Sequence, residues 1–230
     1  MMQIRILVTG GTFDKEYDEL SGKLFFKDTH VQEMLRRGRS RLDLTIETVM
    51  MVDSLDMDDA GRAVIVARCR DAAEPAIVVT HGTDTLEESA YLVARSLPPD
   101  KPVVFTGAMR PASDLGWDGP SNLLDATRVA ASPESSGNGT LVCIGERIHS
   151  ALEVGKTHTE ARDAFESPGL GALGLAHGAR AQAHPQAAGK GEAHGAGVDR
   201  RDPAAAGPSQ QAPQLASVLA ARRQRAQVLA

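Results

Sequence analysis

The chain has 230 residues, enough for one full α/β domain or for two small ones. It carries 30 acidic side chains against 25 Lys and Arg, and the resulting net charge of −5 gives no reason to expect nucleic acid or an anionic membrane as a partner. No apolar run approaches the roughly 20 residues of a membrane span. The N-terminus enters a strand pattern directly, which argues against a signal peptide, so we expect a cytoplasmic protein.

Apolar runs alternate with amphipathic stretches as far as residue 145. Strands are predicted over residues 4–9, 43–49, 76–80, 102–106 and 140–144. Helices are predicted over residues 30–37, 57–71, 85–96 and 119–131. This alternation is typical of an α/β fold in which a parallel sheet is covered on both faces, a three-layer Rossmann-like arrangement.

A turn with two glycines, Thr9-Gly10-Gly11-Thr12, directly follows the first predicted strand. The glycines allow the backbone to turn sharply and to approach a ligand closely. This turn matches neither G-x-G-x-x-G nor G-x-x-x-x-G-K-[ST], so it gives no support to nucleotide binding. Taken alone, the turn fits ordinary βα geometry better than catalysis. Residues 13–27, which include Tyr17, are predicted to form a hairpin or flap over it.

A second polar segment, His81-Gly-Thr83-Asp84-Thr85, lies between the strand at 76–80 and the helix that follows. It places a hydroxyl, a carboxylate and backbone N–H groups at the carboxyl end of a strand, where open α/β sheets bind ligands. Thr85 and Glu88 fit a capping box. The local alternative is that Thr83 and Asp84 only cap the helix.

These two segments and three further blocks resemble the bacterial L-asparaginase family of the threonine-nucleophile type. The five blocks are Thr9–Thr12, His81–Thr85, Thr106–Pro111, Asp118–Leu123 and Gly155–Thr159, which contains Lys156. The resemblance covers about residues 3–174 and is closest to a short, single-domain branch similar to the N-terminal domain of long asparaginases. It implies an amidohydrolase that converts L-asparagine to L-aspartate and ammonia through a threonine acyl-enzyme, without a cofactor or a metal.

The resemblance also implies a role for each candidate residue. Thr12 would attack the amide carbon, and Tyr17 would orient or activate it. Thr83 and Lys156 would assist proton transfer or activate the water for deacylation, and Asp84 would hold the substrate α-ammonium. Which threonine carries the acyl group stays open, with Thr12 favoured.

Substrate binding in the family uses a serine, here Ser54, beside Thr83 and Asp84. A Gln often follows that serine, whereas this chain has Leu55, and the lost hydrogen bond would weaken binding by ~1.5–3 kcal/mol. Long members complete the pocket with an acidic residue from the C-terminal domain of a neighbouring subunit, and nothing after residue 175 resembles that domain. We therefore expect an open pocket and weak substrate binding. The resemblance also implies a homodimer, because the subunit interfaces of the tetrameric members lie on the N-terminal domain.

Composition changes abruptly after Leu175. All eight aromatic side chains lie at or before Phe165, and residues 177–230 carry seven Lys or Arg against three Asp or Glu, a net charge of +4. Such a segment buries too little apolar surface to offset its ordering entropy. We expect an α/β domain over 1–175 and a disordered tail over 176–230, in which the spacing of Leu and Val allows a short helix at 213–230. The composition of the tail favours the hypothesis that the reading frame shifts near residues 172–178, and a genuine flexible tail is the competing interpretation.

Two alternative functions fit parts of the sequence. The first is a weakly active or inactive protein that binds amino-acid amides. Such a protein would need no nucleophile, so the presence of the five candidate catalytic residues argues against it. An ammonia-producing subunit of an amidotransferase would carry an added N-terminal domain, whereas this chain begins at its first strand. Cys69 and Cys143 are expected to be free, buried thiols, since neither lies in a C-x-x-C pair.

Overall fold

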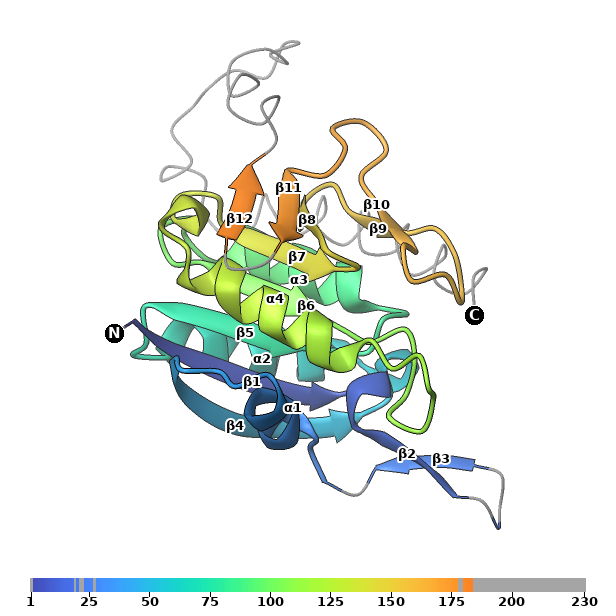
Figure 1. The fold of residues 1–230 in the computed structure, drawn as a ribbon. Coiled ribbons are helices and arrows are strands. Elements are labelled where there is room, and N and C mark those ends of the chain that lie inside the picture. Colours follow the sequence, from blue (N-terminus) through green and yellow to red (C-terminus); the bar gives the residue numbers. More distant parts are fainter. Residues whose placement is uncertain (1, 19, 21–22, 27, 178–179, 184–230) are drawn as a thin grey trace.

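The computed structural model describes residues 2–18, 20, 23–26, 28–177 and 180–183. Its centre is an eight-stranded sheet in the order β12-β11-β8-β7-β6-β5-β1-β4 (Figure 1). Five of these strands run parallel to one another. They are β1 (Gln3–Gly10), β4 (Asp43–Val52), β5 (Ala76–Thr80), β6 (Val103–Thr106) and β7 (Thr140–Ile144). Each corresponds to a predicted strand, and the α/β fold is confirmed.

Three strands that the sequence did not indicate extend the sheet in antiparallel fashion beyond β7. They are β8 (Arg147–Ser150), β11 (Gly174–His177) and β12 (Arg180–Ala183). The sheet therefore continues past Leu175, where the tail was expected to begin. The helix expected over 213–230 lies outside the described residues.

Two small antiparallel ribbons stand apart from the main sheet (Figure 1). The first pairs β2 (Lys15–Asp18) with β3 (Lys23–Phe26), which confirms the predicted hairpin, and it projects from the body of the molecule. The second pairs β9 (Gly155–Lys156) with β10 (Phe165–Glu166). The second ribbon carries the candidate lysine.

Four helices cover the two faces of the sheet (Figure 1). They are α1 (Val31–Arg37), α2 (Asp59–Asp71), α3 (Leu86–Ser96) and α4 (Gly119–Ala131). Helices α1 and α4 lie on one face, and α2 and α3 lie on the other. None of the described helices is long and apolar enough to cross a membrane.

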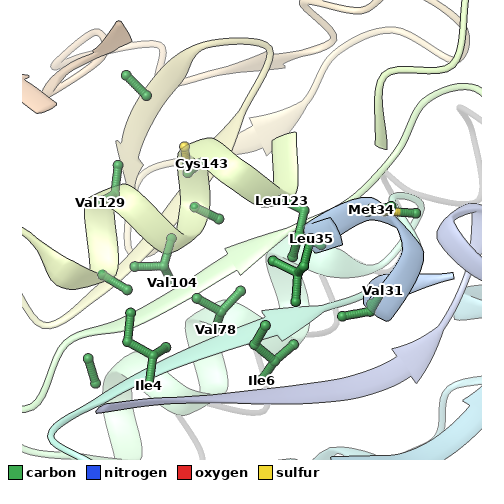
Figure 2. Close-up of a cluster of buried hydrophobic side chains, with 14 of the residues drawn as sticks. Ile4, Ile6, Val31, Met34, Leu35, Val78, Val104, Leu123, Val129 and Cys143 are labelled. Carbon is green, nitrogen blue, oxygen red and sulfur yellow. The ribbon is translucent and has the colours of Figure 1, made fainter. Parts of the chain in front are cut away.

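The two faces of the sheet are filled by alternate side chains of the same strands. Figure 2 shows the cluster under α1 and α4, in which Ile4 and Ile6 of β1 pack with Leu35 and Leu123 of the helices. Leu7 points the opposite way, into the cluster under α2 and α3, because successive strand residues alternate between faces. Full burial of each such side chain contributes about 1.5–3 kcal/mol. Cys69 and Cys143 are free and buried, as predicted.

The predicted capping box at the start of α3 is wrong. Thr85 is the N-cap residue, but its hydroxyl makes no capping bond and instead donates to the carbonyl oxygen of Ser54 over 2.7 Å. Glu88 instead pairs with the buried guanidinium of Arg62 on α2. A buried carbonyl and a buried charge both need hydrogen-bond partners. The Ser54 carbonyl and the Arg62 guanidinium therefore take the two side chains that the local pattern assigned to the cap. At the start of α2, by contrast, the N-cap residue does cap the helix, since Asp58 Oδ1 accepts from the N–H of Gly61.

Candidate active site

The site residues gather where the strand order of the sheet reverses. Strand β1 has β4 on one side and β5 on the other, and all three are parallel, so the connections after β1 and β5 leave in opposite directions. Ligands of open α/β sheets bind at this switch point, outside the carboxyl ends of the strands. The segments that follow β1, β4, β5 and β6 all belong to this edge.

Close contacts join three of these segments and leave no room for a side chain on either Gly11 or Gly82. Gly11 has a φ of +79°, and a Cβ there would lie 2.3 Å from the Cα of Gly82. A Cβ on Gly82 would in turn lie 2.6 Å from the Oγ of Ser54. The Gly11 N–H donates to the Val52 carbonyl over 3.0 Å. The paired glycines therefore turn the chain sharply, as predicted, and their close approach is to the neighbouring loop.

Lys156 reaches the segment after β5 from the separate β9–β10 ribbon. Its Nζ donates to Thr83 Oγ1 over 3.1 Å and to Asp84 Oδ1 over 2.6 Å. The lysine and the threonine are buried, at 5% exposure each, whereas the Asp84 side chain is 31% exposed. The structure thus brings together three of the five predicted catalytic residues, as a hydroxyl, an amine and a carboxylate in hydrogen-bond contact.

Thr12 and Tyr17 lie on the segment that follows β1. Thr12 is half-buried and begins a short 3₁₀ helix (Thr12–Asp14), immediately after the Gly11 contact with Gly82. Tyr17 belongs to β2, where its backbone is paired with Leu24 of β3. The Tyr17 side chain lies outside the part of the structure that is described, so its predicted contact with Thr12 stays a prediction.

Ser54 is buried at the start of a second 3₁₀ helix (Ser54–Asp56), with its side chain against Gly82. Its neighbour Leu55 is 53% exposed. Lys15 at the base of the hairpin pairs with Asp53 and ties the hairpin to this segment. Burial raises the pKa of Asp53, but the hydrogen bonds from Lys15 and from the Leu55 N–H outweigh burial and hold that pKa below its usual value.

His81 is a structural member of the site, a role that the sequence analysis did not assign to it. Its Nδ1 lies 2.8 Å from the carbonyl oxygen of Gly82, and its Nε2 lies 2.9 Å from Ser89 Oγ. Burial lowers the pKa of His81 to about 4, so the ring is neutral at pH 7. A carbonyl only accepts hydrogen bonds, so Nδ1 carries the proton and Nε2 accepts from the Ser89 hydroxyl. The histidine thereby holds the peptide of Gly82 in place.

Asp118 and Asn122 hold the segment after β6, a role that sequence reasoning did not assign. The two carboxylate oxygens of Asp118 accept the N–H groups of Met109 and Arg110 over 3.1 and 3.0 Å. Asn122 Nδ2 donates to the Gly107 carbonyl over 2.9 Å. A Cβ on Gly107 would lie 2.9 Å from Thr83 Cγ2, so this segment borders the lysine cluster directly. Because Asp118 and Asn122 belong to one block of the sequence and their partners to another, their spacing alone did not reveal the link.

A separate groove of about 670 Å³ lies between the end of α1 and the end of α4. It is lined by the segment before β4 and by the last turn of α4, so it sits at the amino ends of the strands, opposite the switch point. None of the predicted site residues lines it. In the described part of the chain, no group of three or more His, Cys, Asp or Glu side chains is placed to hold a metal ion.

The fold and site together define an α/β protein with a threonine–lysine–aspartate cluster at the switch point of its sheet. The model of the family described as "Asparaginase, N-terminal" matches residues 3–188. The chain belongs to the asparaginase family, as the five sequence blocks predicted.

Individual relatives agree with this assignment. The chain is 38% identical over 180 residues to "L-asparaginase 2" of Bacillus subtilis, a match that covers 74% of this chain and 48% of that protein. It is 36% identical over 195 residues to "Probable L-asparaginase periplasmic" of Haemophilus influenzae, covering 77% of this chain and 52% of that protein. The chain therefore spans about half the length of these relatives.

A solved structure shows the same fold. The crystal structure of "Probable Cytoplasmic L-asparaginase" from Campylobacter jejuni superposes with a TM-score of 0.73 at 32% sequence identity. The likeness covers 81% of this chain and 59% of that chain.

Proposed function

We propose that this chain hydrolyses the side-chain amide of L-asparagine to L-aspartate and ammonia. The observation that carries the proposal is the buried Lys156 amine in contact with both Thr83 Oγ1 and Asp84 Oδ1, beside the turn that bears Thr12. Hydroxyls are weak nucleophiles at neutral pH and need a neighbouring group to accept the proton. The names of the relatives, which are L-asparaginases, support asparagine as the substrate.

In the first step, the Thr12 hydroxyl oxygen attacks the amide carbon and loses its proton to a neighbouring base. The tetrahedral intermediate then collapses, the C–N bond breaks, and the nitrogen leaves as ammonia after accepting a proton. The product is an aspartyl ester of Thr12. The N–H groups of Thr83 and of the Gly107–Ala108 turn are the candidate donors to the oxyanion, and each such donor stabilises the transition state by ~3 kcal/mol. The Gly11 N–H is already bonded to Val52 and is not a candidate.

In the second step, water attacks the ester carbonyl, and the C–O bond to Thr12 breaks to release aspartate. The Thr83–Lys156 pair passes the proton from the water to the leaving threonine oxygen. Asp84 fixes Lys156 through Oδ1 and, because its side chain is 31% exposed, can offer Oδ2 to the substrate ammonium. Ser54, whose side chain lies against Gly82, would bind the substrate α-carboxylate.

The test is ammonia release from L-asparagine by the full chain, with Thr12→Ala and Thr83→Ala beside it. Thr127→Ala is the matched control, because Thr127 is a buried threonine on α4 whose hydroxyl donates to the Leu124 carbonyl within the same helix. We expect kcat to fall about 10²-fold or more in both site variants. The control should keep the kcat of the unmodified chain.

Mass spectrometry of the intact chain then identifies the acyl carrier. If Thr12 carries the ester, the Thr83→Ala chain accumulates an aspartyl adduct on Thr12, because its deacylation is impaired. An adduct on Thr83 in the Thr12→Ala chain would reverse the two roles. Asparagine binding without ammonia release from the unmodified chain would refute the hydrolase proposal and favour a binding protein.

The assembly and the cellular location are also proposals. A homodimer is supported by the resemblance to the N-terminal part of an oligomeric family, and light scattering of the full chain checks it. A cytoplasmic location is supported by the name of the Campylobacter jejuni relative, although the Haemophilus influenzae relative is named periplasmic.

A further inference from the structure

The position of Lys156 depends on a contact outside the predicted site. Strand β9 has two residues and, among the strands that the structure describes, pairs with β10 alone, in a ribbon separate from the eight-stranded sheet (Figure 1). The ladder of the main sheet therefore does not fix the lysine backbone. Its side chain, by contrast, must meet Thr83 and Asp84 at hydrogen-bond distance.

The Glu87 side chain bonds the Lys156 backbone to helix α3. Its Oε2 accepts the backbone N–H of Lys156, and its side chain is buried, at 2% exposure. Glu87 stands in the first turn of α3, where the helix dipole favours a negative charge. A buried carboxylate that accepts a backbone N–H makes a charge-assisted hydrogen bond, roughly twice as strong as a neutral one.

Thr83, Asp84 and Glu87 belong to one short stretch of chain, and together they bond both the backbone and the side-chain amine of Lys156. Thr83 and Asp84 hold its Nζ, and Glu87 holds its main-chain nitrogen. We propose that Glu87 is a positioning residue. By bonding the Lys156 backbone to the start of α3, it sets the distance between Lys156 Nζ and Thr83 Oγ1. The inference rests on the proposed hydrolase function, because only then does the lysine-to-threonine distance govern a rate.

Two conservative substitutions separate position from charge. Glu87→Gln keeps the length of the side chain and a carbonyl oxygen that can accept the Lys156 N–H. Glu87→Asp keeps the charge but withdraws the acceptor by one methylene. A displacement on the order of 1 Å at a catalytic group can cost about 10²-fold in rate.

We therefore expect Glu87→Asp to lower kcat for ammonia release about 10²-fold with little change in KM. Glu87→Gln should stay within about threefold of the unmodified chain, since its amide oxygen can still accept the Lys156 N–H at the same position. The pH profile of kcat for Glu87→Gln should keep its midpoints. The reverse ranking, with Asp active and Gln inactive, would show that charge matters and position does not. Equal rates in all three chains would also overturn the proposal.

Hydrogen exchange of the Lys156 amide supplies a readout that needs no activity. The amide should exchange slowly in the unmodified chain and in Glu87→Gln, and fast in Glu87→Asp. If the unmodified chain releases no ammonia, the hydrolase proposal fails, but these exchange rates still decide whether Glu87 anchors Lys156. Fast exchange in the unmodified chain would refute the anchor on its own.

Discussion

Lys156 carries its amine at a place where an unpaired charge would be costly. Taking an ammonium group out of water costs several kcal/mol unless partners replace the solvent. The Lys156 side chain is 6% exposed, and Asp84 and Thr83 supply the partners. These two contacts replace the water that the buried amine loses.

Replacing Lys156 with methionine keeps the length and bulk of the side chain but removes its amine. We expect kcat for ammonia release to fall about 10²–10⁴-fold, the usual contribution of a positioned acid or base. Lys101→Met is the control, because Lys101 donates to the carbonyl oxygens of Cys69 and Ala72 at the end of α2, away from the site. That change should cost at most about 1 kcal/mol in unfolding free energy and leave kcat unchanged. Equal kcat values for the two variants, per folded molecule by circular dichroism, would remove Lys156 from the mechanism.

At the scale of elements, the site depends on segments that touch through their backbones. Gly11 and Gly137 both have positive φ, at +79° and +84°, but they differ in their surroundings. A Cβ on Gly11 would collide with the backbone of Gly82, whereas a Cβ on Gly137 meets nothing within 4 Å. Substituting each glycine in turn therefore separates the energetic cost of the backbone conformation from the cost of the clash between neighbouring loops.

We expect Gly137→Ala to lower the unfolding free energy by about 1–2 kcal/mol, the cost of a left-handed conformation for an ordinary residue, with no loss of activity. Gly11→Ala should cost more, because the clash also separates the turn after β1 from the segment after β5. Its kcat should fall about 10²-fold, as expected for a displacement near 1 Å. Urea unfolding and ammonia release measure the two effects. Similar losses for both variants would mean that the contact between Gly11 and Gly82 is not needed.

The elements also show what the sequence could predict. The five parallel strands carry apolar runs and the four helices between them are amphipathic, so their alternation was enough to predict them and the three layers. Strands β8 to β12 have two to four residues each and no continuous apolar run, so pairing with distant partners decides them. The same holds for the site. Thr83 and Asp84 are neighbours in a motif, whereas the partner of Glu87 is 69 residues away, and no local pattern encodes that contact.

At the scale of the whole molecule, burial of neutral imidazoles ties stability to pH. His149 on β8 is buried, with Nδ1 2.9 Å from Ser167 Oγ, and burial together with the charge of Arg147 lowers its pKa to about 4. The pKa of a histidine in the unfolded chain is about 6.5, so between pH 6.5 and 4 this histidine binds more protons in the unfolded chain than in the folded one. The stability that this histidine contributes is therefore complete above pH 6.5 and is lost as the pH falls towards 4.

His149→Gln removes this titration and leaves the catalytic residues untouched. From pH 7 to pH 5, His149 alone should account for about 2 kcal/mol of the fall in unfolding free energy, given the difference between its two pKa values. The variant should be less stable at pH 7, because it loses a fitted ring, but its stability should fall less on acidification, by about that amount. Urea unfolding of both chains at the two pH values measures the difference, and other titrating groups cancel in the comparison. If both chains lose the same free energy between pH 7 and pH 5, His149 is not held neutral by burial, and β8 is more open to water than its place in the sheet implies.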